Sequence, residues 1–379
     1  MTDWQDKEIQ VVAFAVPFPP DYGGVIDVYY KIRALHRLGI KVHLHAYTYG
    51  AHQPAPELEQ LCASVHYYPR AVSAKYLQGW PYIVASRYNA NLISKVRQIG
   101  QPVLLEGLHT AFLVPHLREF GIRHALRLHN VEWKYYLLLA EGERSYARKR
   151  YFLEESRRLK GYERILAKTP LLTLSPLDTG YARHEFPAAP VTEILPFHSF
   201  DQAEILMGEG EYALFHGNLS VNENEEAALW LIREVFTGEQ YPLVIAGKNP
   251  GKALRHAANA FRHVRLIENP SEEDMLHLLQ HAQVHLLPNR QPTGMKLKWV
   301  NALHTARFII AHPDMAAGLS GKAGIYSAIT PQDYFECMNI IRKTNFYDDL
   351  YKERLDVLDK SFSNSLNAKM LGNQNILLL

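Results

Sequence analysis

The chain has 379 residues, of which 47 % are apolar and 21 % charged, and its net charge is +2. This length suits two domains with sizeable cores, and so mild a charge argues against nucleic-acid binding. Cys62 and Cys337 are far apart and lack metal-type spacing, which excludes a disulfide framework and a zinc site and favours a reducing compartment. The N-terminus does not resemble a signal peptide, and the sequence has no apolar run of about 18 residues. We therefore expect a soluble cytoplasmic protein.

The first half of the chain alternates short apolar runs with amphipathic segments. Residues 11–16 (VVAFAV) predict a buried strand, and residues 25–39 repeat apolar side chains at helical spacing and end at Gly39. Further strands are predicted at 41–47, 65–68, 102–107, 124–129, 171–175 and 191–196. Strands that are apolar throughout and alternate with helices predict a parallel, doubly wound sheet.

The second half repeats this alternation. Strands are predicted at 211–217, 241–247, 264–269, 284–288 and 308–313, and residues 222–236 predict a helix with acidic residues in its first turn. The predicted fold class is therefore α/β, with two tandem doubly wound (Rossmann-like) domains. The predicted parts are an N-terminal domain (1–198), a C-terminal domain (199–345), and a helical segment (346–379) that packs back toward the first domain. The hinge is predicted at 196–210, which is rich in loop formers.

Ligands of open α/β sheets bind at the carboxyl ends of the strands, so the loops that follow the strands are the candidate sites. Gly23 and Gly24 lie between the first strand and the first helix. Their backbone can approach a ligand closely, and the helix N-terminus favours an anion such as a diphosphate. The alternative is a tight turn without a ligand.

Polar side chains also follow two later strands. Glu106 and His109 come after one strand, and His129, with Asn130 and Glu132, comes after the next. Each histidine alone would more often be structural. Two neighbouring strands that both end in histidine predict that at least one of them acts in acid–base or hydrogen-bonding chemistry.

A third candidate lies around Gly294. Arg290, Lys296 and Lys298 surround this glycine where a loop enters a helix, and Asn301 follows in that helix. Cations and free helix N–H groups hold phosphates well, and Asn301 could bind a ribose or sugar hydroxyl. The alternative is an inert, exposed basic helix start.

Residues 145–168 predict a long helix with many basic side chains. The interleaved glutamates favour a solvated face. The alternative is a face that meets an anionic acceptor or a membrane surface.

Four segments together resemble the retaining glycosyltransferases of the two-Rossmann (GT-B) fold, in the group that includes glycogen synthase and bacterial mannosyltransferases (glycosyltransferase family 4-like). The resemblance spans nearly the whole chain, in order. The segments are YGGVIDVYYKIRALHRLGIKVHL, LRLHNVEW, FHGNLSVNENEEAALWLI and GMKLKWVNALHTARFII. The last is similar to the family's GxKxKxxEALAxGxPVV segment.

This resemblance implies two domains facing a cleft that binds a nucleotide-diphosphate sugar. It implies that His129 faces the reacting sugar, and we place His109 and Glu106 beside it in the catalytic site. It implies a diphosphate site at Gly23, Gly24, Gly294, Lys296 and Lys298. The nucleoside is expected at Asn301, Glu268, Asn269, Gly217 and Asn218.

The chain also departs from the family pattern. The family's pair of glutamates corresponds to Thr293 and Asn301, and the basic pair after the donor strand is missing. These departures leave a pseudoenzyme, or a nucleotide-sugar-binding partner of a true transferase, as the alternative function. A sugar-nucleotide epimerase shares the fold, whereas the absent glycine fingerprint disfavours a nicotinamide enzyme.

The expected reaction is a metal-independent hexosyl transfer from a UDP- or GDP-sugar, without a cofactor. The expected acceptors are a glycan, a lipid-linked sugar or a protein, in cell-envelope glycan, polysaccharide or glycoconjugate synthesis. No nucleic acid is expected as a partner. The basic helix 145–168 is the expected place for any peripheral contact with the inner face of the plasma membrane.

Overall fold

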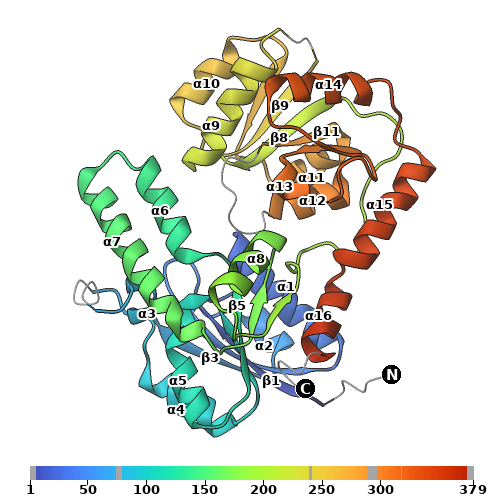
Figure 1. The fold of residues 1–379 in the computed structure, drawn as a ribbon. Coiled ribbons are helices and arrows are strands. Elements are labelled where there is room, and N and C mark those ends of the chain that lie inside the picture. Colours follow the sequence, from blue (N-terminus) through green and yellow to red (C-terminus); the bar gives the residue numbers. More distant parts are fainter. Residues whose placement is uncertain (1–5, 74–78, 239–240, 289–296, 317, 374–379) are drawn as a thin grey trace. The chain divides into compact units, whose positions relative to one another are not determined.

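The computed structural model of the chain describes residues 6–73, 79–238, 241–288, 297–316 and 318–373 (Figure 1). The described residues divide into two compact units. The first runs to Ser199 and takes up the chain again from Phe362, and the second runs from Phe200 to Ser361.

The first unit is built on a seven-stranded parallel sheet. Its strands are β1 (Glu8–Ala13), β2 (Lys41–Thr48), β3 (Ser64–Pro69), β4 (Val103–Glu106), β5 (His124–Leu128), β6 (Leu171–Thr173) and β7 (Val191–Glu193). Their spatial order is β3-β2-β1-β4-β5-β6-β7, so the winding reverses between β1 and β4. A ligand crevice of a doubly wound sheet lies at this reversal, outside the carboxyl ends of the strands.

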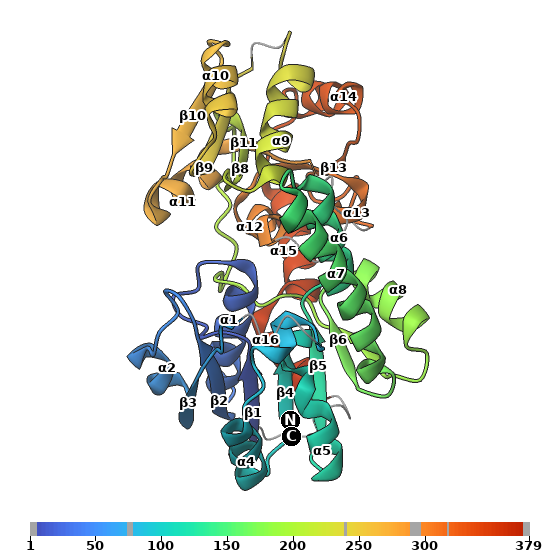
Figure 2. The same cartoon turned by 90° about the vertical axis from the view of Figure 1, so that its left-hand side faces the viewer.

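Helices connect these strands. They are α1 (Gly23–Arg37), α2 (Pro56–Leu61), α3 (Tyr82–Ala85), α4 (Ala90–Ile99), the 3₁₀ helix η2 (Leu108–Leu113), α5 (Val114–Glu119), α6 (Glu132–Gly142), α7 (Tyr146–Tyr162), the 3₁₀ helix η3 (Glu163–Leu166), α8 (Pro176–Glu185) and α16 (Asn364–Asn373). Helices α6 and α7 pack together as a hairpin, which both views show (Figures 1 and 2). In this hairpin the Ser156 hydroxyl donates to the Trp133 carbonyl at 2.7 Å.

The last helix of the chain belongs to the first unit. Helix α16 packs against α1, and its Ala368 and Leu371 are buried in the same core cluster as Val28 and Ile32. The Asn367 amide also donates to the Leu195 carbonyl at 3.0 Å. Residues more than 300 positions apart in sequence therefore complete one core.

The second unit contains a six-stranded parallel sheet. Its strands are β8 (Tyr212–Asn218), β9 (Leu243–Lys248), β10 (Val264–Glu268), β11 (Ala282–Leu287), β12 (Phe308–Ala311) and β13 (Ile325–Ser327). The order is β10-β9-β8-β11-β12-β13, with the reversal between β8 and β11. Its helices are α9 (Asn222–Trp230), the π-helical turn η4 (Leu231–Val235), α10 (Lys252–Asn259), α11 (Glu272–His281), α12 (Leu297–Thr305), α13 (Pro313–Ala316), α14 (Pro331–Ile341) and α15 (Asp348–Ser361).

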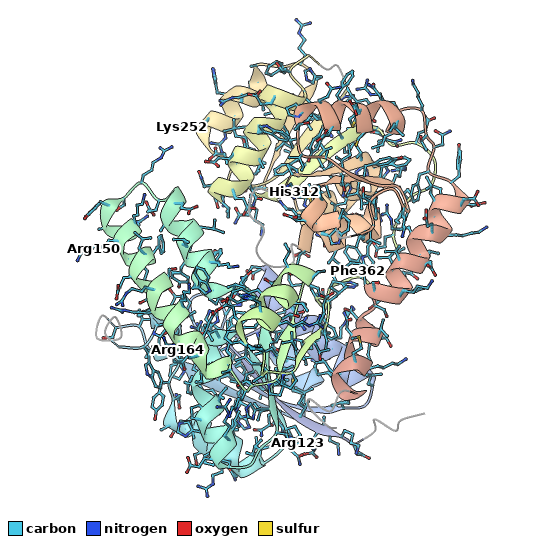
Figure 3. All side chains as sticks on the ribbon, in the orientation of Figure 1. Arg123, Arg150, Arg164, Lys252, His312 and Phe362 are labelled. Atoms are coloured by element: carbon cyan, nitrogen blue, oxygen red, sulfur yellow. The ribbon has the colours of Figure 1, made fainter. Side chains whose placement is uncertain are left out.

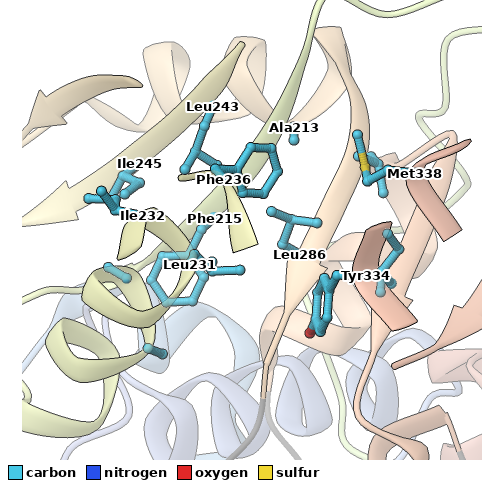
Figure 4. Close-up of a cluster of buried hydrophobic side chains, with 14 of the residues drawn as sticks. Ala213, Phe215, Leu231, Ile232, Phe236, Leu243, Ile245, Leu286, Tyr334 and Met338 are labelled. Atoms are coloured by element: carbon cyan, nitrogen blue, oxygen red, sulfur yellow. The ribbon is translucent and has the colours of Figure 1, made fainter. Parts of the chain in front are cut away.

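The larger core cluster of the second unit lies on one face of this sheet, where strand and helix side chains interdigitate (Figure 4), and a smaller cluster under α11 covers the other face. Phe215 and Leu286 project from β8 and β11 toward Leu231 of η4 and Tyr334 of α14. Burial of such side chains contributes about 1.5–3 kcal/mol each to stability. This core fixes the strands whose carboxyl ends carry the predicted nucleoside residues.

A buried arginine holds the far end of α12. The Arg354 guanidinium of α15 is fully buried and donates to the carbonyls of Leu303, Ala306, Arg307 and Ala323. These groups include carbonyls at and just beyond the C-terminus of α12, where a cation is favourable.

The structure confirms the predicted fold class, two parallel Rossmann-like sheets with helices between the strands. Every predicted strand is present within a few residues, and β13 was not predicted. Residues 145–168 were predicted as one long helix, but α7 ends at Tyr162 and a 3₁₀ turn follows. Within the described ranges, no helix combines the length and the hydropathy that crossing a membrane requires.

Candidate active site

The site in the first unit centres on a glutamate–histidine pair. Glu106 ends β4 and His129 follows β5, and the register of these parallel strands brings both side chains to the same edge. His129 Nε2 lies 2.8 Å from Glu106 Oε2. The carboxylate can only accept, so Nε2 carries a proton, and in the neutral form of the ring Nδ1 is an acceptor. Nδ1 makes no hydrogen bond within the described part of the chain, so it remains available to a substrate.

A buried ionic network supports Glu106. Lys31 Nζ of α1 lies 2.6 Å from Glu106 Oε1 and 2.9 Å from Asp27 Oδ2. Arg127 of β5 donates to both Asp27 oxygens, at 2.7 and 2.8 Å, and also to the carbonyls of Ile194 and Leu195. Two carboxylates thus face two cations, and the network joins α1, β4, β5 and the segment after β7.

These charges keep both carboxylates ionised. Burial alone would raise the pKa of Asp27, but Arg127 and Lys31 hold it well below its usual range. Burial likewise acts to raise the pKa of Glu106, but Lys31 and His129 hold it below the usual value. Glu106 is therefore a poor general base, and it acts by orienting His129.

The same residues offer a possible metal cluster, because ligand atoms of Asp27, Glu106 and His129 lie within 4.8 Å of one another. They do not fit a metal ion. Lys31 Nζ already contacts both carboxylates, and Arg127 donates to both oxygens of Asp27. A divalent ion here would add charge to a group whose two anions are already neutralised.

Phe14 lines the wall of this site. Its ring centroid lies 5.1 Å from that of His109 and 5.4 Å from that of His129. Burial and the charge of Arg87 hold the pKa of His109 well below its usual value, so this ring is neutral near pH 7. His109 Nδ1 is buried and has no partner in the described residues. Gly107 has φ +73°, and a Cβ there would approach His109 Nδ1 to 2.9 Å.

Gly24 is required by packing against the same ring. A Cβ at this position would lie 2.6 Å from Phe14 Cζ, so no larger residue fits unless Phe14 moves. The predicted glycine pair therefore begins α1 beside the two histidines, and the structure brings Gly23, Gly24, Glu106, His109 and His129 to one edge of the sheet.

Replacing Gly24 with alanine should destabilise the first unit because it overpacks Phe14. The matched control is Gly161→Ala in α7, where a Cβ would meet nothing within 4 Å. Both changes gain helix propensity, so the difference between them isolates the clash, which we expect to be about 1–3 kcal/mol in the free energy of unfolding. Urea unfolding of the two variants measures it, and equal stabilities would contradict the packing argument.

A buried carboxyl, Glu132, begins α6 beyond His129. Burial raises its pKa to about 8, with Glu163 contributing in the same direction and Arg87 against it. The pKa of Glu163 is itself raised to about 7, mainly by burial, although Tyr181 donates to it at 2.7 Å. Near neutral pH, Glu132 therefore keeps its proton and adds no negative charge to the site.

The raised pKa of Glu132 predicts a pH-dependent stability. Its folded-state pKa exceeds the unfolded value of roughly 4.3, so its contribution is full below that value and is lost as pH rises toward 8. Relative to Glu132→Gln, the native chain should lose roughly 1 kcal/mol of unfolding free energy per pH unit in this window. Urea unfolding at pH 5, 7 and 8.5 measures this loss, with exposed Glu141→Gln on the same helix as control. Parallel pH curves for the native chain and Glu132→Gln would contradict it.

In the second unit, three predicted residues meet around Asn224, which the sequence analysis did not select. Its amide donates to the Asn218 carbonyl at 2.9 Å, and Lys298 Nζ lies 3.5 Å from its oxygen. A Cβ on Gly217 would lie 3.2 Å from the Asn224 side chain. Gly217, Asn218 and Lys298 therefore converge at the carboxyl end of β8, beside the reversal of this sheet.

The other predicted nucleoside residues lie elsewhere in the unit. Glu268 forms a two-point ion pair with Arg255 of α10, and Asn269 accepts from the Asn249 N–H at 2.9 Å. Asn301 lies on α12, one to two turns from its start, and is partly buried. Arg290, Thr293, Gly294 and Lys296 fall outside the described residues.

Helix α7 carries part of the predicted basic segment. Arg157 and Arg158 pair with Glu154 at 3.0 and 2.9 Å, so glutamates of the same helix neutralise some of its charge. Arg150 and Arg164 lie toward opposite ends of this segment (Figure 3).

The sequence and the fold of the chain were compared with those of known proteins. No family model matches the chain. It is 24 % identical over 332 residues to an uncharacterised 44.6 kDa protein in the cps region of Klebsiella pneumoniae, covering 80 % of this chain and 82 % of that protein. Among solved structures, it is similar to a glycosyltransferase from Rickettsia africae, with a TM-score of 0.62, 11 % identity, and 97 % of each chain covered.

Two further solved structures agree. TarM has a TM-score of 0.64 at 8 % identity, covering 98 % of this chain and 99 % of that one. The UDP-forming α,α-trehalose-phosphate synthase from Burkholderia vietnamiensis has a TM-score of 0.59 at 10 % identity, covering 97 % and 98 %. At such low identity these likenesses establish architecture alone. The chain has the two-domain GT-B fold that these glycosyltransferases share.

Proposed function

We propose that the chain is a glycosyltransferase that moves a sugar from a UDP- or GDP-sugar to an acceptor hydroxyl. The observation that carries this proposal is the oriented Glu106–His129 pair, at the strand ends of a fold shared with sugar transferases. We further propose that it works in cell-envelope polysaccharide synthesis, as the cps-region relative suggests.

The chemistry follows from the charges of the site. Glu106 is committed to Lys31 and His129, so among the described residues of the first unit it is not a free carboxylate base beside His129. His129 Nδ1 accepts a hydrogen bond from the donor sugar, or donates one to the departing oxygen when the ring is protonated. In this proposal the leaving phosphate takes the acceptor proton, and the sugar keeps its anomeric configuration.

The donor phosphates need positive charge, and the proposal supplies it without a metal ion or cofactor. The N-terminus of α1 at Gly23 and Gly24 offers free N–H groups, and Lys298 stands in the first turn of α12. Each group is fixed within its own unit, and fixed donors stabilise developing charge without reorganisation.

The first test is nucleotide binding by thermal shift with UDP, GDP, ADP and CMP, with and without magnesium. A ligand present at about one hundred times its dissociation constant should add roughly 2.7 kcal/mol to the stability of the native chain. A selective, magnesium-independent rise for UDP or GDP is expected. It selects the donor for an assay in which retention is read from the anomeric configuration of the product.

Two results would redirect the proposal. Nucleotide binding without transfer to any acceptor would favour a pseudoenzyme, consistent with Thr293 and Asn301 at the positions of the family's glutamates. Consumption of the donor without an acceptor would favour an epimerase. No shift with any nucleotide would contradict donor binding itself.

A further inference from the structure

Two arginines near the candidate active site, Arg70 and Arg87, have no carboxylate partner among the residues that the structure describes. Arg87 is 6 % exposed, and its guanidinium donates to the carbonyls of Phe14 and Ile83 at 2.8 and 2.7 Å. Both acceptors are neutral. Within the described residues, Arg87 forms no ion pair, so its buried charge is uncompensated.

Arg70 binds Ser86, the residue that precedes Arg87. Arg70 Nε donates to the Ser86 hydroxyl at 3.1 Å, and the Ala71 N–H donates to the Ser86 carbonyl at 2.9 Å. Its guanidinium carbon lies 4.6 Å from the ring centroid of Tyr49 and 5.5 Å from that of Tyr82. These contacts hold the side chain in place, and none of the described carboxylates pairs with it.

The nearby acids are engaged elsewhere. Asp21 lies 3.4 Å from His52, and Glu155 accepts the Tyr82 N–H at 2.7 Å and pairs with Arg158. Glu132 keeps its proton near neutral pH, as its raised pKa shows. Two adjacent cations without a neutralising acid are costly unless an anion joins them.

The ring of Tyr22 lies edge-on to that of His52, with 5.4 Å between the two centroids. Burial raises the pKa of its phenol, while the charges of Arg87 and Arg70 act against that rise. The residue is 45 % exposed and directly precedes Gly23. Phe14, whose carbonyl binds Arg87, has its ring against His129, so this group adjoins the proposed reaction centre.

We propose that Arg70, Arg87 and Tyr22 bind an anionic group of a substrate, either a phosphate or a carboxylate. The planar guanidinium groups suit such oxygens, and within the described residues Arg70 donates through Nε alone, so its two Nη groups make no hydrogen bond there. The proposal rests on the proposed function for the identity of the substrate. The anion belongs either to the donor diphosphate or to an acidic acceptor, because both carry this chemistry.

The test is calorimetric titration with inorganic phosphate, which needs no turnover. Arg70→Gln should weaken phosphate binding at least about tenfold, since it removes the charge from a charge-assisted hydrogen bond. The matched control is Arg97→Gln, which removes another arginine placed over an aromatic ring, 5.0 Å from the Phe120 centroid. It should leave binding unchanged. Tyr22→Phe, which removes one hydroxyl from an exposed ring, should weaken binding less and serves if Arg70→Gln does not fold.

Absence of phosphate binding by the native chain would overturn the proposal, as would equal binding by Arg70→Gln and Arg97→Gln. UDP and GDP then identify the source of the anion. A parallel loss of nucleotide affinity in Arg70→Gln assigns the site to the donor. Unchanged nucleotide affinity with a raised KM for the acceptor assigns it to the acceptor. Phosphate binding without nucleotide binding or turnover would contradict the proposed glycosyltransferase function but would still support the anion site.

Discussion

Replacing His129 with alanine should lower kcat about 100- to 1,000-fold and change the dissociation constant of the nucleotide less than about threefold. In the proposed function His129 Nδ1 faces the reacting sugar, whereas the nucleotide is expected on the second unit. The ring is already oriented by Glu106 at 2.8 Å, so its removal takes away a preorganised group. Initial rates give kcat, and nucleotide titrations of the same preparation give the dissociation constant.

The control for this prediction lies on the same strand. His124 begins β5, at the end opposite His129, and its Nδ1 contacts the Ile122 carbonyl at 2.9 Å. His124→Ala should leave kcat within about threefold of the native value. Glu106→Gln should lose turnover as well, because a neutral amide holds the imidazole N–H less strongly than the carboxylate does. Equal losses of kcat and nucleotide affinity in His129→Ala would remove the histidine from the reaction.

Replacing Asp27 with asparagine should cost about 3–5 kcal/mol of unfolding free energy, because it leaves buried Lys31 and Arg127 with too little negative charge. Asp27 is 1 % exposed, accepts from both cations and also accepts the Phe197 N–H at 2.8 Å. Its lowered pKa predicts that this stabilisation is present above the unfolded pKa, roughly 3.9, and is lost as pH falls below it.

The chain offers a matched surface pair for comparison. Asp356 and Lys360 of α15 have the same i,i+4 spacing as Asp27 and Lys31, with a contact of 2.7 Å, but both side chains are exposed. Asp356→Asn should therefore leave stability unchanged. Because the two units can unfold separately, hydrogen exchange of α1 and of α15 should follow each change locally. Comparable losses of unfolding free energy in Asp27→Asn and Asp356→Asn would show that burial does not determine how much the ion pair stabilises the protein.

The strands and the meeting of Glu106 with His129 were predictable. Fully buried parallel strands are continuous apolar runs, and each of these two residues is among the first polar ones where such a run stops. Parallel strands end at one edge, so neighbours in the sheet bring such residues together. These features were predictable because they depend on the local alternation of apolar and polar residues, which can be read from the sequence itself.

The ionic network was not predictable from that pattern. Asp27 and Lys31 occupy polar positions of an amphipathic helix, where exposure is the ordinary expectation, yet both are buried. Their partners Glu106 and Arg127 lie 75 and 100 residues away. Arg127 is a lone charge inside an apolar strand, which could have suggested a buried partner without naming it. Arg70 and Arg87 lie between two predicted strands, in a stretch for which no helix was predicted. Their sequence context therefore did not indicate that their side chains come together.

The place of α16 in the first unit has a consequence for synthesis on the ribosome. Ala368 and Leu371 enter the same core as β1 and α1, so that core cannot close until α16 has been translated. Every strand of the second sheet is made before then. Domains usually fold in the order in which they emerge, but here the later unit can be finished first. A nascent chain that has not yet reached residue 362 exposes the α1 surface that α16 covers. We expect this chain to depend on chaperones until α16 has been synthesised.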